Sequence, residues 1–541
     1  MDRRKFLSGN LLQGNKKNEA RVLSGIEPYT GTFGSRQAWH LLRRTTFGPS
    51  PKQINDFSKM TLNDAINALF QAQSAPSPPV DPATGITWVD KPYNGTNNSH
   101  YVRYNKDWWL GLMMSGAMNI IEKMTLFWHN HFVSDSATVA DARYVYKQNA
   151  LLRQYALGNI KDFVKEVTKD PAMLRYLNGN TNVASHPNEN YGREFQELFT
   201  IGKGPEIQPG NYTNYTEDDV KAAAKVLTGW RDTSSSVTSA FYPNSHDTSD
   251  KQFSSDYGNT IIKGRTGASA GDDELNDLVD MIFSQQATAL FLCREIYRWF
   301  VYYEIDDTTE QNVIEPLADL LRTNNYEVQP VLETLLGSAH FFDDANIGCM
   351  IKNPVDFNTQ LLLFLEIQMP DPVKDTPNYY NYLDKLILAQ TEIGMALLDP
   401  PNVAGWSAYY QVPDYYRLWM NTVTMPLRNG FTDALVNGTM YFGNSFKLDI
   451  IAYIKKVVSD PTDAATIVAE LADALFIDSL TQKQKDYVLN TVFMQGLPAY
   501  EWTSAWNAYI SNPDTANTTA VKNSLNPLFR FLFRMAEFQL M

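Results

Sequence analysis

The stretch Thr216-Glu217-Asp218-Asp219-Val220-Lys221-Ala222-Ala223-Ala224-Lys225-Val226-Leu227-Thr228-Gly229-Trp230 indicates what kind of fold this sequence forms. Thr216 can accept a hydrogen bond from the first turn of a helix, and Asp219 occupies the reciprocal position of a capping box. Gly229 stands where a helix commonly ends, because glycine tolerates the left-handed backbone found there. These signals predict a helix over residues 218–230 with both ends marked.

Helical spacing of apolar residues continues on both sides of this stretch. Toward the N-terminus it begins at Gln37 and stops at Gly48-Pro49. Residues 71–100 and 395–425 lack the spacing, and we expect long loops there. Further helices are predicted from Ser50, over Thr61–Leu69, through most of 101–232, and over Asp273–Phe283, Ala287–Tyr303, Ile314–Arg322, Val328–Ala339, Asp449–Val458, Ala464–Ala474, Gln482–Val492 and Leu528–Phe538.

Residues 232–272 interrupt the helical pattern. The short segments Ser239–Tyr242 and Thr260–Ile262 have strand-like composition and lie among Ser, Asp and Gly residues. We therefore predict an all-α, mainly helical fold, in which a large multi-helix body carries a small β-containing insertion around 232–272.

The length of 541 residues suggests two to four folding units at ~150 residues per domain, or one large helical body. We expect a flexible N-terminal arm over 1–35, an N-terminal helical lobe over 36–310 and a C-terminal helical lobe over 311–541. The sequence has no repeat with a fixed period of about 20–50 residues, which argues against a regular solenoid.

The composition limits the classes of protein that this sequence can represent. Hydrophobic residues make up 44% of the chain and aromatic residues 13%, enough for a substantial core. The net charge of −14 argues against a nucleic-acid partner, because phosphate binding requires clustered Lys and Arg. No apolar run of about 18 residues indicates a transmembrane helix. Cys293 and Cys349 are expected to be buried free thiols, although one disulfide between them stays open.

The N-terminus, Met1-Asp2-Arg3-Arg4-Lys5-Phe6-Leu7, resembles a twin-arginine export signal. A signal peptide would continue with an apolar region of about 7–15 residues, but residues 8–21 are mostly polar here. A retained polar arm is at least as well supported as a cleaved signal.

Six further strings, in order along the chain, resemble one bacterial family. They are Leu41-Leu42-Arg43-Arg44-Thr45-Thr46-Phe47-Gly48, Lys123-Met124-Thr125-Leu126-Phe127-Trp128-His129-Asn130-His131-Phe132, Pro187-Asn188-Glu189-Asn190-Tyr191-Gly192-Arg193-Glu194, Tyr215-Thr216-Glu217-Asp218-Asp219-Val220 with Leu227-Thr228-Gly229-Trp230, His246-Asp247, and Pro400-Pro401-Asn402-Val403-Ala404-Gly405-Trp406. The family they resemble is catalogued as domain of unknown function 1800, and the resemblance extends from Gln37 to Gln539.

The resemblance implies a large helical protein, often exported to the periplasm or cell surface, with no settled activity. It also implies a partner, because such proteins are frequently encoded beside a second protein similar to alkaline phosphatases and sulfatases. Gly192 stands where the family usually has Ala, and His186 where Lys is expected. The missing apolar region after Arg3-Arg4 leaves a cytoplasmic location open.

His129 and His131 are the first candidate metal ligands, because His-x-His pairs often bind a metal ion. On a helix, however, residues two apart lie ~200° apart around the axis, so these two side chains would share an ion only if the helix unwinds at Trp128. On the helical interpretation His129 shares a face with Glu122. The alternative is that one histidine is packed in the core and the other lies at the surface.

A second group of candidates begins the helix after Pro187, which Asn188 can cap. Glu189, Arg193 and Glu194 are candidate catalytic residues on its polar face. Glu189–Arg193 and Arg193–Glu197 are expected to pair at i,i+4 spacing. The alternative is a structural ion network between helices; the functional hypothesis is a carboxylate cluster that meets His129 across a helix pair.

The insertion and the loop near residue 400 supply the remaining candidates. His246, a candidate metal ligand, and the candidate catalytic Asp247 lie in the irregular insertion with Lys251, a candidate for substrate binding. Trp406 and Tyr409 begin a Tyr- and Trp-rich segment that can form a stacking platform for sugars. The alternative is that these aromatic residues cover the core and support a long loop.

Two functional hypotheses follow. The first is a metal-assisted hydrolase of an extracytoplasmic polymer or ester, in which a divalent metal activates water and a carboxylate acts as base. The second is a non-catalytic helical partner or glycan-binding protein that works with the phosphatase- or sulfatase-like neighbour. If His129, Glu194 and His246 converge in a cleft, the hydrolase is favoured; if they are scattered and paired, the partner is favoured. The sequence has no G-x-S-x-G, P-loop, dinucleotide-binding, H-E-x-x-H or EF-hand motif.

Overall fold

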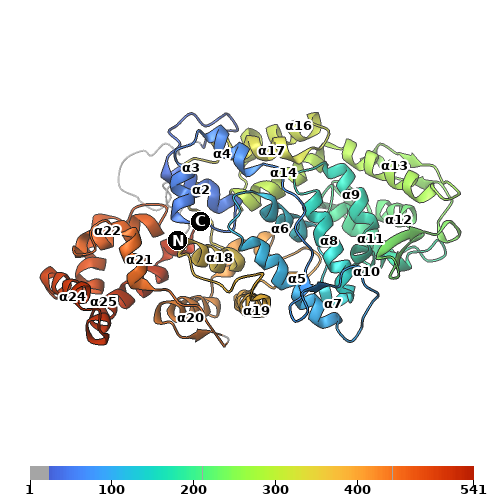
Figure 1. Cartoon of the computed structure of the whole chain (residues 1–541). Coiled ribbons are helices and arrows are strands. Elements are labelled where there is room, and N and C mark those ends of the chain that lie inside the picture. The colour runs from blue at the N-terminus through green and yellow to red at the C-terminus, as the bar shows by residue number, and fades with distance from the viewer. Residues whose placement is uncertain (1–22, 210, 442) are drawn as a thin grey trace.

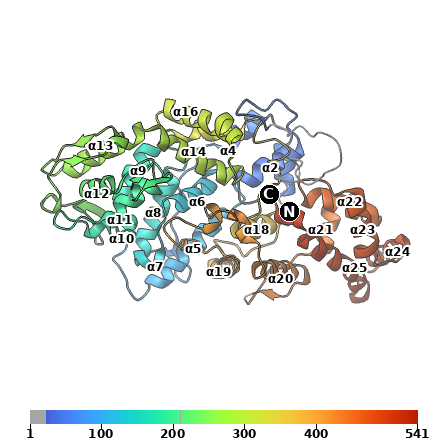
Figure 2. The same cartoon turned by 180° about the vertical axis from the view of Figure 1, so that it is seen from behind.

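The computed structural model describes residues 23–209, 211–441 and 443–541. Within these ranges helices predominate, and strands occur only as two-stranded antiparallel hairpins. The predicted mainly helical fold with a small β insertion is therefore confirmed. The body is elongated, with the segment 217–284 at one end of it and the segment 450–534 at the other (Figures 1 and 2).

The end of the body that carries most of the candidate residues is built from the first half of the chain. Its helices pack around the aromatic core residues Trp128, Phe132 and Phe163. They are α5 (Asn98–Met113), α6 (Ile121–His131), α7 (Ser136–Val139), α8 (Ala142–Gln154), α9 (Ile160–Lys169), α10 (Pro171–Tyr176), α11 (Glu189–Glu197), α12 (Glu217–Val226), α13 (Ala270–Ser284) and α14 (Gln286–Phe300).

The middle and the opposite end combine early and late segments. In the middle lie α2 (Ser35–Thr45), α3 (Pro51–Phe57), α4 (Leu62–Leu69), α15 (Asp307–Thr309), α16 (Glu315–Thr323), α17 (Val328–Leu336), α18 (Pro354–Phe364) and α19 (Thr376–Glu392) (Figure 1). Toward the other end lie α20 (Thr424–Asn437), α21 (Ile450–Val457), α22 (Ala464–Leu475), α23 (Gln482–Tyr487), α24 (Ala499–Ser511) and α25 (Thr515–Arg534).

The predicted insertion contains two hairpins. The first pairs β5 (Trp230–Thr233) with β6 (Thr238–Phe241), with Trp230 opposite Phe241. The second pairs β7 (Lys251–Gln252) with β8 (Ile261–Ile262), with Lys251 opposite Ile262. Three small hairpins were not anticipated: β1 (Val80–Asp81) with β2 (Ile86–Thr87), β3 (Glu206–Gln208) with β4 (Asn211–Tyr212), and β9 (Met440–Tyr441) with β10 (Asn444–Ser445).

The capping signals around α12 act as predicted at its start. Thr216 accepts a hydrogen bond from the Asp219 amide, and the Asp219 carboxylate accepts one from the Thr216 amide at 2.8 Å. The predicted C-terminal end was too late, because α12 ends at Val226. Gly229, with φ of +94°, then turns the chain so that Trp230 begins β5.

One continuous hydrophobic core runs from Ala38 to Met541. The predicted lobe boundary at 310/311 lies inside an uninterrupted helical stretch, where α15, a π-helical turn at Glu310–Ile314 and α16 follow one another. The division into lobes over 36–310 and 311–541 stays a prediction. Cys293 and Cys349 are buried and free, as predicted.

The predicted arm over 1–35 falls largely on residues 1–22, which lie outside the described residues. The resemblance to an export signal at Arg3-Arg4 falls on the same residues. From Ser24 the chain follows the segment after α17. The Tyr29 amide donates to Gly337 O at 2.9 Å, and the Ala339 amide to Glu27 O at 2.7 Å. In the part of the chain that is described, no helix is both long enough and apolar enough to span a membrane.

Candidate functional site

His129 is buried on α6 between two tryptophan rings. Its ring lies edge-on to Trp109 and Trp406, with centroids 5.4 and 5.8 Å away. Neither ring nitrogen has a hydrogen-bond partner among the described residues. Burial lowers the pKa of His129 to about 4, although Asp399 acts in the opposite direction. The imidazole is therefore neutral at pH 7 and has aromatic neighbours.

His131 points to a different part of the core, as the helical spacing predicted. Its Nε2 lies 3.0 Å from Phe199 O, so this nitrogen carries the proton and donates to the carbonyl. Burial lowers the pKa of His131 to about 4, against the opposing effect of that hydrogen bond. His131 is thus tied to the backbone near the end of α11.

Glu122, on the polar side of α6, is paired with residues of the neighbouring helices α5 and α8. Glu122 accepts a hydrogen bond from Trp109 Nε1 at 2.9 Å and pairs with Arg153 at 2.6 Å. A buried polar face needs such partners. The hypothesis that the α11 carboxylates would supply them was wrong, because α5 and α8 provide them instead.

Helix α11 begins at Glu189 and is capped by Asn188, as predicted. The expected i,i+4 pairing of Arg193 with Glu189 and Glu197 was wrong. Arg193 instead makes a bidentate ion pair with Glu217 at the start of α12, with distances of 2.6 and 2.5 Å. This cross-helix pair is possible because a side chain at Gly192 would meet Val220 O at 2.8 Å, so the glycine lets the two helices approach closely.

On α11, Glu194 is the candidate carboxyl group with a strongly shifted pKa. Burial, with a smaller effect from Glu197, raises the pKa of this half-buried carboxyl to about 7, although Arg193 opposes the shift. Glu197 accepts a hydrogen bond from the Tyr215 hydroxyl at 2.9 Å. Two neighbouring carboxyl groups with different environments are a feature of acid–base sites, and also of structural ion networks.

The insertion brings His246, Asp247 and Lys251 together, with Glu274 of α13 as the group that joins them. Lys251 Nζ lies 2.6 Å from Glu274 Oε2, and both side chains have zero exposure. His246 Nδ1 lies 2.9 Å from Thr228 O, and its Nε2 is 3.1 Å from Glu274 Oε1. Sequence reasoning missed Glu274 because it lies 23 residues after Lys251, on a helix with other acidic residues.

Asp247 faces its own loop. Its amide donates to Thr228 Oγ1 at 2.8 Å, and its carboxylate accepts from the Ser249 amide at 2.8 Å. Burial opposes ionisation, but the Ser249 hydrogen bonds and the nearby Lys251 charge lower the pKa of Asp247 overall. The predicted juxtaposition of His246, Asp247 and Lys251 is found, and its contacts anchor the loop.

Trp406 and Tyr409 are buried, at 2% and 7% exposure, so neither ring is available to stack on a sugar. Tyr409 stacks on Trp299 at 4.4 Å, and its hydroxyl accepts a hydrogen bond from Asn353 at 3.1 Å. The Trp406 amide donates to the Asn130 side chain at 3.0 Å. These contacts support the alternative that the segment covers the core.

The candidate metal ligands do not come together. The neighbours of His129, Glu194 and His246 are different residues in each case. In residues 23–209, 211–441 and 443–541, no group of three or more His, Cys, Asp or Glu side chains is arranged to hold a metal ion. The predicted convergence of the three residues is therefore not found, because long-range packing directs each side chain into separate surroundings.

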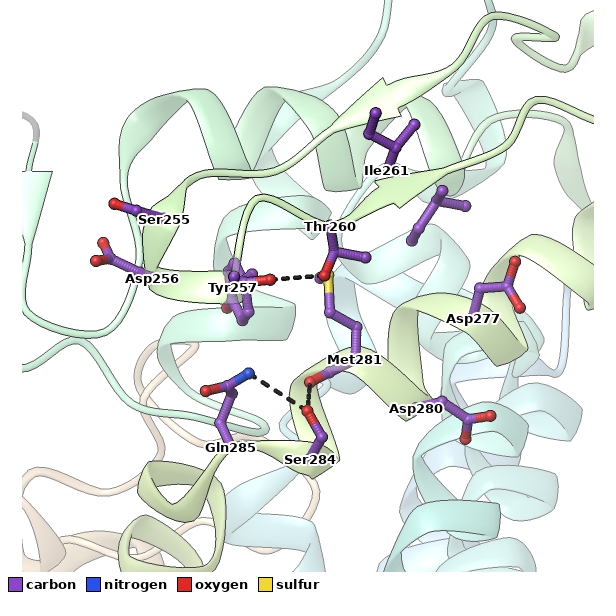
Figure 3. A pocket seen from close by; sticks show the side chains of 12 residues that line it. Ser255, Asp256, Tyr257, Thr260, Ile261, Asp277, Asp280, Met281, Ser284 and Gln285 are labelled. Carbon is purple, nitrogen blue, oxygen red and sulfur yellow. Dashed lines mark hydrogen bonds between the residues drawn. The ribbon is translucent and has the colours of Figure 1, made fainter.

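An open groove lies beside the buried Glu274 cluster, between the β7–β8 hairpin and α13 (Figure 3). Its volume is about 540 Å³. One wall is the hairpin and the short 3-10 turn Ser255–Tyr257 within it; the other is the exposed side of α13. The lining side chains carry hydroxyl, carboxyl and amide groups, and they include Ser255, Asp256, Thr260, Asp277, Asp280, Ser284 and Gln285.

Buried polar links hold the hairpin wall in place. Asp219 of α12 accepts hydrogen bonds from both the amide and the hydroxyl of Ser254, each at 2.7 Å. The Tyr257 hydroxyl donates to Gln196 of α11 at 2.8 Å. Together with the Lys251–Glu274 pair, these links join the hairpin to three helices. The only sequence signal for the groove was the irregular insertion itself.

The fold and the site describe a mainly helical protein in which a hairpin insertion, fixed by buried polar links, borders an open groove. The chain belongs to the family described as protein of unknown function (DUF1800), whose model matches residues 40–540. The membership expected from the six strings is thus confirmed. No curated protein and no solved structure significantly matches the chain.

Proposed function

We propose that this protein is a non-catalytic binding protein that holds a glycan in the groove between the β7–β8 hairpin and α13. The observation that carries the proposal is the groove itself: about 540 Å³, open to solvent, with a polar lining and walls tied by buried contacts. Volumes of about 300–1,000 Å³ are typical of ligand sites. Walls that are already ordered reduce the entropy lost when a ligand binds.

The chemistry of the lining favours a hydroxyl-rich, uncharged ligand. Sugar hydroxyl groups donate to carboxylates and exchange hydrogen bonds with amides and hydroxyls, and the groove offers all three. Ile261 and Met281 add apolar surface for the C–H faces of a sugar ring. Asp256, Asp277 and Asp280 make the groove unfavourable for phosphate or sulfate groups because like charges repel.

The partly buried Asp256 differs in its partners from the two other carboxylates that line the groove. Asp277 pairs with Arg265 at 2.6 Å, and Asp280 with Lys161 at 2.7 Å. Asp256 has no basic partner among the residues described, and burial, followed by the charge of Asp219, raises its pKa. A carboxylate in this state gains when a ligand supplies hydrogen-bond donors.

Binding of neutral oligosaccharides by the purified full chain, measured by calorimetry or on a glycan array, tests the proposal. We expect Asp256→Asn and Gln285→Ala to weaken binding about tenfold each, because each removes one or two hydrogen bonds to the ligand. Asp272→Asn is the matched control, since Asp272 of α13 is not among the residues that line the groove and pairs with Lys169 at 3.2 Å. Binding that is absent, or equally reduced in all three variants, would contradict the proposal.

A binding role agrees with an extracytoplasmic location and with a phosphatase- or sulfatase-like partner, both of which the family resemblance implies. In such a pair this chain would hold the polymer while the partner acts on it. Co-purification of the two proteins, with and without Asp256→Asn, tests whether binding to the partner is separate from binding to the glycan.

A hydrolase of a polymer or ester is the second candidate, supported by Glu194. A carboxyl group with a pKa near 7 is partly protonated at neutral pH and can act as a general acid. Hydrolysis of polymeric or ester substrates that is lost in Glu194→Gln but kept in Glu189→Gln would support this candidate. Elemental analysis of purified protein tests the metal: a stoichiometric metal that is lost in His129→Phe would restore the metal-assisted hypothesis.

A further inference from the structure

Five basic side chains are buried in one part of the core. The helices that carry most of them, α2, α6 and α20, lie away from α13 and the groove beside it (Figures 1 and 2). Each of the five side chains is at most 3% exposed. They come from α2, α6, α20 and the segment before α18, and they are Arg43, Arg44, Lys123, Lys352 and Arg428. Among the residues that the structure describes, Asp356 at the start of α18 is the one buried carboxylate that acts on this group.

Most contacts of these cations are with neutral groups. Lys352 Nζ donates to Phe538 O at 2.6 Å, and Arg428 Nη2 donates to Lys352 O at 2.9 Å. The Arg43 guanidinium lies 3.4 Å from the centre of the Trp39 ring. Only Lys123 has a direct ion pair, with Asp356, among the described members of this group. Positive charge therefore exceeds negative charge in this part of the core.

The electrostatic effects agree with that imbalance. Burial lowers the pKa of Lys352 well below its usual value, and the charges of Arg43 and Arg428 lower it further. Burial likewise lowers the pKa of Arg43 to about 9 and that of Arg428 to about 9. Burying charges that lack counter-charges is costly, so an additional negative group in this place would stabilise the fold.

A small cavity adjoins this basic cluster, and two of the five basic residues line it. Its volume is about 10 Å³, room for a single water-sized species, and Arg44, Lys123, Asn353, Asp356 and Trp419 are among the residues that line it. Two of the lining residues have hydrogen-bond donors with no acceptor among the described residues.

Arg44 and Trp419 supply these donors. Arg44 is 2% exposed, and its Nη2 donates to Asn346 O at 3.3 Å and to Cys349 Sγ at 3.4 Å. Its Nε and Nη1, however, have no acceptor among the described residues, and neither has Trp419 Nε1. Since buried donors are nearly always paired, something that accepts hydrogen bonds belongs there.

Asp356 lines the cavity, but its oxygens are already in use. Oδ1 accepts from Lys123 and from Gln360 Nε2 at 3.3 Å, while Oδ2 accepts from Asn353 Nδ2 at 2.8 Å. We propose that the cavity binds one halide ion, held by Arg44 and Trp419. Such an ion accepts from several donors at once and offsets the excess positive charge.

Halide binding is tested with crystals of the full chain grown in bromide. An anomalous bromide peak within hydrogen-bond distance of Arg44 Nη1 is the expected result. In parallel, the melting temperature in chloride should exceed that in gluconate at equal ionic strength. Arg44→Met should abolish this difference, while Arg36→Met should keep it, because Arg36 is on the same helix but pairs with Asp344 and Asp478.

The proposal is overturned if the crystals show no bromide near Arg44 and the parent protein melts at the same temperature in chloride and in gluconate.

Discussion

Glu274 Oε2 lies 2.6 Å from Lys251 Nζ, and this fully buried ion pair joins α13 to the β7–β8 hairpin. The other oxygen of Glu274 accepts a hydrogen bond from the Arg265 amide at 2.7 Å, and the buried His246 lies against the same carboxylate. One side chain thus holds three points of the insertion that borders the groove.

Replacing one member of this pair should destabilise the fold strongly. We expect Glu274→Gln or Lys251→Met to lower the free energy of unfolding by about 3–5 kcal/mol, because each leaves the opposite charge buried without its partner. The double variant should lose less than the sum of the two. Urea denaturation measures the losses, and Lys263→Met, which removes a surface pair with Asp250, should cost less than about 1 kcal/mol. Additive losses would show that the two charges do not interact.

Acid should destabilise the protein partly through His129. Its pKa is about 4 in the folded chain and near 6.5 when unfolded, so protons bind the unfolded state preferentially as pH falls from 6.5 toward 4. We expect the parent to lose about 2–3 kcal/mol more stability than His129→Phe between about pH 7 and pH 4.5. Denaturant unfolding at both pH values measures this difference, with replacement of the exposed His186 as the control. Equal losses in parent and His129→Phe would mean that His129 is solvated.

Glu194 should have the opposite dependence on pH. Its pKa of about 7 in the folded state lies above the unfolded value of 4.5, so its contribution is most favourable below pH 4.5 and is lost as pH rises through about 7. Glu194→Gln should therefore gain stability relative to the parent between about pH 5 and pH 8. Melting curves across this range test the sign, with Glu189→Gln as the matched control on α11. A constant difference between parent and Glu194→Gln would rule out the shifted ionisation.

Trp230 and Trp406 should both be important for stability. Trp230 packs against Phe241 at 5.3 Å and Trp406 against His129, and their exposures are 5% and 2%. We expect Trp230→Ala and Trp406→Ala to cost about 3–5 kcal/mol each, as truncation of buried aromatic residues usually does. Equilibrium unfolding measures this, and losses below about 1 kcal/mol in both variants would indicate that the rings are solvent-accessible.

Local signals in the sequence predicted the local features of the structure. The caps at Asn188 and Thr216, the interruption at 232–272 and the opposite directions of His129 and His131 all depend on residues within a few positions of one another. Their interactions are set by helix geometry and short-range hydrogen bonds, which the order of residues specifies. Family membership followed from the same kind of information, the succession of short strings.

Contacts between residues that are distant in sequence were determined only by the tertiary structure. Arg193 has possible partners on its own helix, yet it pairs with Glu217, because the glycine at 192 brings α12 within reach. Glu274 joins His246 and Lys251, and Arg44 meets Trp419 around a cavity, although 375 positions separate these two residues. Such pairings depend on which helices pack together, a choice made by the summed burial of many side chains across the whole core, whereas caps, turns and helix faces are determined by neighbours in the chain.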